Sequence, residues 1–130
     1  MSQENVELIR SALSFEDLQW FVTELLHPDV EWHDQRELPG ATVHHGIEGV
    51  RRHLAAAKET LDYDTLDLLE IFDAGESVVA RYRFYARGQS SGASVERDAV
   101  FVYSFRGAKV ERVEIFGTRA EALKAVGLAE

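Results

Sequence analysis

The stretch VEWHDQ, residues 30–35, places a tryptophan, a histidine and an aspartate side by side. A carboxylate such as Asp34 can remove a proton from a carbon next to a carbonyl group, and a neighbouring imidazole can carry a proton at neutral pH. Other groups able to do such chemistry are His44, His45, His53 and Glu114. The first question is which of these side chains the fold brings together.

Strand alternation separates the residues of this stretch. In a strand over Val30–Asp34, successive side chains point to opposite faces, so Trp32 and Asp34 share one face while Glu31 and His33 share the other. We expect the face with Trp32 to point into the protein, which makes Asp34 a candidate base. Because aspartates at strand ends often cap the following turn, a structural role for Asp34 stays open.

The two long strands over 77–87 and 95–105 alternate in the same way. Their more apolar faces predict four inward aromatic side chains, namely Tyr82, Phe84, Phe101 and Tyr103. Val100 and Val102 alternate with these aromatics and suit an outer surface that packs against a second copy of the chain. The aromatic set is the predicted lining of a pocket for an apolar molecule.

The last strand, 109–116, offers a second acid. Its two faces carry Val113 and Ile115 on one side and Val110, Arg112, Glu114 and Phe116 on the other. If the first face joins the outer surface, Glu114 projects inward, where it must pair or stay protonated. Asp34 and Glu114 would then be an acid/base set on opposing walls. The alternative is that Arg112 and Glu114 pair with each other in solvent.

The histidines allow two further hypotheses. His53 lies beside the apolar stripe of a predicted helix after Gly46, where its ring can act on a substrate or serve only in packing. A metal site would combine His33 or His44 with Asp34 and another histidine. No HxH or HxxxH spacing supports such a site, so the sequence predicts neither a bound metal nor a cofactor.

The elements that would position these residues follow from periodicity and capping signals. Helices are expected over the apolar stripes Val6–Leu13 and Leu18–Leu25, and a third begins after Gly46. Period-two segments follow over 65–73, 77–87, 95–105 and 109–116. Thr118 and Glu121 form a capping box for a short last helix that ends at Gly127. Helices followed by a meander of strands predict an α+β fold with helices over one sheet face.

Composition limits the function classes. The 130 residues predict a single domain over 1–130, with no cysteine and therefore no disulfide or thiolate chemistry. A net charge of −9 repels phosphate backbones and anionic lipids, so we expect no nucleic-acid or membrane partner. With neither a signal peptide nor a membrane-length apolar run visible, we expect a cytoplasmic protein.

Several phrases resemble the bacterial SnoaL-like branch of the nuclear transport factor 2-like superfamily. They are MSQENVELIR, LLHPDVEWHD, HHGIEGVRRHL, FDAGESVVARYRF and RAEALKAVGL, which together span nearly the whole chain. The resemblance implies a cone: a curved antiparallel sheet and three N-terminal helices enclose an apolar cavity, and a short helix ends the chain. It also implies a homodimer through the outer sheet face.

The superfamily includes isomerases, cyclases, hydrolases and noncatalytic binders, so the resemblance must be tested against particular residues. Asp34 falls where ketosteroid isomerases place their base, but Phe101 replaces their acidic oxyanion donor. Glu114 matches one acid of the epoxide hydrolases, whose arginine and other acid are replaced by Tyr82 and Phe84. The polyketide cyclases, which need one carboxylate or histidine as base, match best.

These arguments predict a small-molecule pocket that catalyses cofactor-independent proton transfer, of isomerase or cyclase type, on an apolar carbonyl compound. The predicted catalytic residues are Asp34, Glu114 and His53. The predicted substrate-binding residues are Trp32, His44, Tyr82, Phe84, Phe101, Tyr103 and Phe116. The alternative is a noncatalytic ligand-binding or dimerisation module built around the same cavity.

Overall fold

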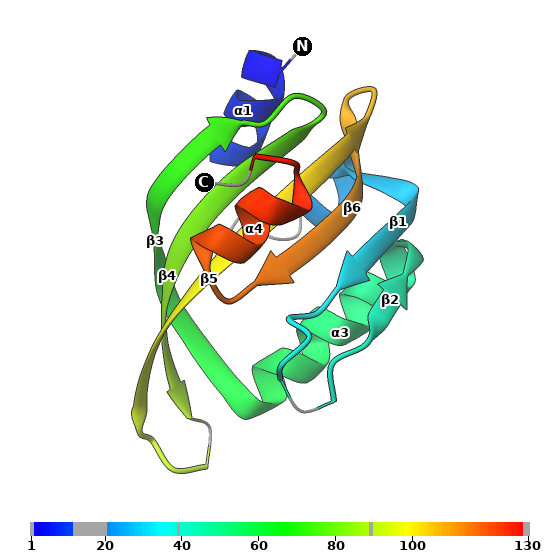
Figure 1. The fold of residues 1–130 in the computed structure, drawn as a ribbon. Helices are drawn as coiled ribbons and strands as arrows, with labels where there is room; N and C mark the ends of the chain where they lie inside the picture. Colours follow the sequence, from blue (N-terminus) through cyan, green and yellow to red (C-terminus); the bar gives the residue numbers. More distant parts are fainter. Residues whose placement is uncertain (1, 12–20, 39, 89, 129–130) are drawn as a thin grey trace.

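The protein folds around one curved sheet with helices on both sides, as the computed structural model shows (Figure 1). The structure describes residues 2–11, 21–38, 40–88 and 90–128. Its helical elements are α1 (Ser2–Ser11), a π-helical turn η2 (Phe21–Leu25), α3 (Gly46–Thr60) and α4 (Arg119–Ala125). Its strands are β1 (Leu26–His33), β2 (Val43–His45), β3 (Leu61–Asp73), β4 (Ser77–Gly88), β5 (Ser94–Arg106) and β6 (Lys109–Phe116).

The six strands form a single sheet in the order β2-β1-β6-β5-β4-β3. All neighbouring strands are antiparallel except β1 and β6, which run parallel. The sheet is therefore mixed, whereas a purely antiparallel sheet was expected. The α+β class is confirmed. Of the predicted helix over Leu18–Leu25, residues 18–20 lie outside the described part of the chain, and Phe21–Leu25 form the π-helical turn η2.

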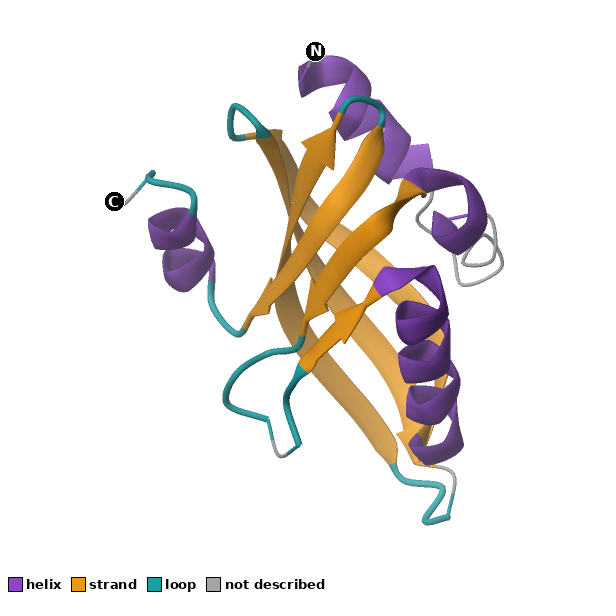
Figure 2. Cartoon of the chain, turned by 90° about the vertical axis from the view of Figure 1, so that its right-hand side faces the viewer, coloured by secondary structure: helices purple, strands orange, loops and turns teal. Residues whose placement is uncertain are grey.

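The sheet has an inner and an outer face, and the helices divide between them. Figure 2 shows α1 and α3 on one side of the strands and α4 on the other. The inner face carries the main core, in which Val30, Trp32 and Tyr103 pack with residues of α1 and α3. The outer face carries a smaller core, where Val100 and Val102 pack under Ala122 of α4.

Pairing between β4 and β5 confirms the inward aromatic face. Ala80 lies opposite Phe101 and Val78 opposite Tyr103, and both pairs belong to the inner core. Phe84 also packs against that core from β4. In the turn between β3 and β4, Asp73 accepts a hydrogen bond from the Gly75 amide, and Gly75 has φ 85°.

The predicted faces of the last strand were wrong. Tyr103 pairs with Val113 and Phe101 with Ile115, so both aliphatic residues join the inner core instead of the outer surface. A register shift near Phe105 lets Val110 also point inward, which strict alternation from Val113 forbids. Glu114 therefore lies on the outer face beside Val102, its partner on β5.

Phe116 is a further correction to the predicted pocket lining. It packs against the outer core of Val79, Val100, Val102 and Ala122 and not against the inner aromatic residues. Among the described residues, no helix has the length and apolar character needed to cross a bilayer.

Candidate functional site: an Asp–His–His cluster beside an aromatic face

Three of the predicted site residues meet at one end of the sheet. Asp34 follows β1, His44 lies in β2 and His53 lies in α3. His44 Nε2 is 3.1 Å from Asp34 Oδ2, and His53 Nε2 is 3.2 Å from Asp34 Oδ1. The carboxylate thus has one imidazole at each oxygen.

Local pairing explains this convergence. In the β1–β2 ladder Trp32 lies opposite His44, so His44 shares the inner face with Trp32. Asp34, two residues beyond Trp32, continues the same face. The Asp34 amide donates to the Thr42 carbonyl at 3.1 Å, and the Thr42 amide donates to Asp34 Oδ2 at 3.2 Å. Asp34 therefore anchors the loop after β1 and also holds the two imidazoles.

The cluster is partly withdrawn from water. The side chain of Asp34 is 14% exposed, and those of His44 and His53 are 20% and 25% exposed. The two imidazole rings stack with their centroids 4.0 Å apart. Burial lowers the pKa of His53; the nearby charge of Asp34 opposes this shift, and His44 adds to it. His53 is therefore mainly neutral at neutral pH.

An aromatic surface adjoins the cluster on the inner face. The Trp32 ring lies 6.0 Å from His53 and 6.0 Å from Phe101, measured between ring centroids. Tyr82 and Phe84 extend the surface from β4, with Tyr82 5.2 Å and Phe84 5.9 Å from Phe101. Phe84 and Phe101 are only partly buried, so the edge of this surface is not completely covered.

The inner face contains polar groups as well as rings. The hydroxyls of Tyr82 and Tyr103 are 2.8 Å apart and share a hydrogen bond. Burial raises the pKa of both phenols, which keeps them neutral donors. Trp32 Nε1 is buried with no hydrogen-bond partner among the described residues. A buried donor without an acceptor costs about 1–3 kcal/mol, which a polar group of a ligand can recover.

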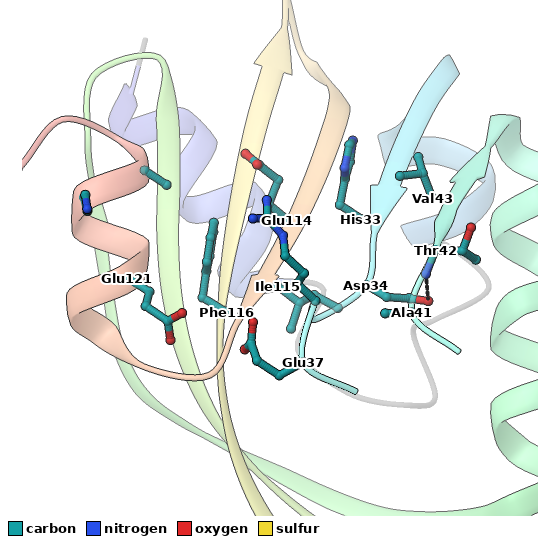
Figure 3. Close-up of a pocket in the computed structure, with 13 residues that line it drawn as sticks. His33, Asp34, Glu37, Ala41, Thr42, Val43, Glu114, Ile115, Phe116 and Glu121 are labelled. Atoms are coloured by element: carbon teal, nitrogen blue, oxygen red, sulfur yellow. Dashed lines mark hydrogen bonds between the residues drawn. The ribbon is translucent and has the colours of Figure 1, made fainter. Parts of the chain in front are cut away.

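Glu114 stands apart from this arrangement. It lies on the outer face, where it lines a pocket of about 530 Å³ together with Asp34, His33 and Phe116 (Figure 3). The pocket lies between α4, the end of β6 and the segment joining β1 to β2. His44 and His53 are not part of its lining. Asp34 is thus the residue common to the outer pocket and the inner cluster.

The sequence identified the members of the cluster but not their association. Asp34 and His53 were predicted to be catalytic and His44 to bind substrate, while the metal hypothesis combined Asp34 with His33 or His44 and another histidine without specifying which. Asp34 and Thr42, whose amide donates to the Asp34 carboxylate, are eight positions apart, and nothing in the sequence between them predicts that β1 pairs with β2. The two residues predicted as inward on β6, Glu114 and Phe116, are the ones displaced to the outer face.

Comparison with known proteins agrees with this architecture. The family model of the SnoaL-like domain matches residues 9–113. A search of curated proteins finds no match. A solved structure from Mesorhizobium loti, described as a SnoaL-like polyketide cyclase, superposes with a TM-score of 0.77 at 19% identity, covering 88% of this chain and 97% of the other.

Two further solved structures share the fold. A nuclear transport factor 2-like protein from Burkholderia xenovorans has a TM-score of 0.70 at 24% identity, covering 88% of this chain and 89% of its own. The protein TerC, co-crystallised with polyporic acid, has a TM-score of 0.72 at 21% identity, and the match covers 95% of this chain and 98% of TerC. The chain belongs to the SnoaL-like domain family and has the nuclear transport factor 2-like fold.

Proposed function

We propose that this protein binds a small apolar carbonyl compound on its inner aromatic face and catalyses cofactor-independent proton transfer on it, as isomerases and cyclases do. The observation that carries this proposal is the position of Asp34, between two imidazoles and beside the aromatic surface. Asp34 is the base that removes the carbon-bound proton, and the imidazoles exchange protons with it.

Each part of the site has a task in this reaction. Phe84, Phe101 and the Trp32 ring hold the apolar body of the substrate. One hydroxyl of the Tyr82–Tyr103 pair, the one that accepts within the pair, and the indole N–H are neutral donors for a carbonyl oxygen that gains negative charge. TerC was crystallised with polyporic acid, which makes that compound a reasonable first ligand to test.

Proton transfer can be measured without knowing the natural substrate. The protein is incubated in D₂O with a panel of β-dicarbonyl compounds, and NMR follows deuterium incorporation at the activated carbon. Asp34→Asn removes the base, so we expect exchange to slow by about 10²-fold or more. Asp29→Asn is the matched control, since Asp29 lies on β1, the strand that leads into Asp34, with its side chain 76% exposed.

The results separate this proposal from a binder that has no catalytic activity. A compound that binds to the protein and exchanges at the same rate with Asp34→Asn as with the native chain would exclude Asp34 as the base. Binding without any exchange above the buffer rate would identify the inner face as a ligand site only.

A further inference from the structure

The Asp34–His44–His53 cluster also has the composition of a metal site. One carboxylate and two imidazoles supply three potential ligand atoms, and these atoms all lie within 4.8 Å of one another. They come from three different elements, so their association is a tertiary feature of the fold. No other group of three or more such side chains occurs in the described part of the chain.

The distances between the ligand atoms suit a single ion. An ion with bonds of about 2.1 Å separates neighbouring ligand atoms by about 3.4 Å in a tetrahedron and about 3.0 Å in an octahedron. The two measured separations, 3.1 Å from His44 Nε2 to Asp34 Oδ2 and 3.2 Å from His53 Nε2 to Asp34 Oδ1, fall in this range.

The support around the carboxylate also favours coordination. The Thr42 amide donates to Asp34 Oδ2 and holds the carboxylate in place, as supporting hydrogen bonds do around metal ligands.

We propose that Asp34, His44 and His53 bind a divalent transition-metal ion of the zinc type, leaving at least one coordination position open. Two nitrogen ligands and one oxygen ligand suit Zn²⁺, Co²⁺ or Ni²⁺ better than Mg²⁺ or Ca²⁺, which prefer oxygen. This property is additional to the proposed proton transfer and does not depend on it. Because an ion would occupy the same lone pairs, bound Zn²⁺ blocks the base.

The direct test is calorimetric titration of the native chain with ZnCl₂ after treatment with EDTA and desalting. We expect saturable binding of one Zn²⁺ per chain and no comparable heat with MgCl₂. Substitution of Co²⁺ gives a visible absorption spectrum that reports nitrogen and oxygen ligation directly.

Variants then assign the site. His44→Ala and His53→Ala each remove a ligand, and we expect each to weaken Zn²⁺ binding by about tenfold or more. His45→Ala is the matched control, because His45 is the next residue of β2 and its side chain is exposed. Circular dichroism verifies that each variant is folded, and His44→Gln replaces His44→Ala if the alanine variant is not.

Three outcomes overturn the proposal. They are no saturable Zn²⁺ binding by the native chain, unchanged affinity in both folded ligand variants, and equal loss in His45→Ala. Deuterium exchange measured in EDTA tests the proton-transfer proposal in the absence of metal, so a failure of one proposal leaves the other independently testable.

Discussion

His53 couples the stability of the protein to pH. Burial, the main cause, lowers the pKa of His53 below 6.5, the ordinary value that the unfolded chain keeps. Protonation therefore favours the unfolded state. The stability that His53 contributes is fully present above pH 6.5 and is lost as the pH falls from there through the folded-state pKa.

We expect the free energy of unfolding to fall as the pH is lowered below 6.5, and to fall less in His53→Gln, which cannot titrate. Denaturant melts at several pH values measure both slopes. The pKa of Glu70 is lowered mainly by its hydrogen bond from Arg119. Glu70 therefore titrates at more acidic pH and does not contribute to the change in stability just below pH 6.5. Identical slopes for the two proteins would contradict the assignment to His53.

The Tyr82–Tyr103 hydrogen bond gives a second prediction for individual side chains. Both residues are buried, and replacing one tyrosine by phenylalanine leaves the other hydroxyl without this partner. We expect each single variant to lose about 1–2 kcal/mol of stability, and the double variant to lose less than the sum. A double-mutant cycle from urea melts measures the coupling, and strict additivity would show that the hydroxyls do not stabilise each other.

Much of the site could be predicted residue by residue, because alternation within one strand is a local property. Trp32, Tyr82, Phe101 and Tyr103 all lie on the predicted inner face. The association of Asp34 with His44 could not be predicted, since it depends on strand pairing across a loop whose length does not determine the register.

At the level of elements, the error on β6 has a physical cause. The notion of two faces assumes unbroken alternation, but the register shift near Phe105 turns both Val110 and Val113 inward. A bulge leaves no clear signal in a single sequence. The apolar pairs Tyr103–Val113 and Phe101–Ile115 lie in the inner core of the fold.

Helix α4 was predicted correctly from its capping box. Thr118 Oγ1 accepts from the Glu121 amide at 3.2 Å and donates to the Glu121 carboxylate at 2.9 Å. Thr118→Ala removes both hydrogen bonds, and we expect a loss of about 1 kcal/mol in the free energy of unfolding. Denaturant melts measure it, with Thr118→Ser as a control that keeps the hydroxyl. Equal losses in the two variants would contradict the capping role.

Side-chain contacts also hold α4 on the sheet. Arg119 donates to both carboxylate oxygens of Glu70 on β3, at 2.9 and 3.2 Å, and its guanidinium lies over the Phe72 ring. Leu123, which is 4% exposed, is buried beneath the helix. The helix therefore covers part of the outer face and forms one wall of the 530 Å³ pocket.

For the whole molecule, the proposed homodimer must use outer-face residues that α4 leaves uncovered. A charged substitution at Val113 cannot test dimerisation, because Val113 is fully buried in the inner core and a charge there would unfold the chain. Arg83 is a better choice. It bonds Asp98 at 2.8 Å and lies 3.4 Å from Glu96 on the outer face.

We expect light scattering to give twice the chain mass of 14.7 kDa for the native protein. Arg83→Glu places three acids together, and we expect it to shift the mass toward the monomer. Arg87→Glu is a control at an exposed position farther along β4. A native mass of one chain, or a dimer unaffected by Arg83→Glu, would contradict association through this face.

The parallel pairing of β1 with β6 has a consequence for the order of folding. β1 holds Trp32 and leads into Asp34, and it lies between β2, which follows it closely in the chain, and β6, which is far away in the chain. Pairing between strands distant in the sequence slows folding, so we expect the β1–β6 ladder beside Trp32 to form later than the β1–β2 ladder.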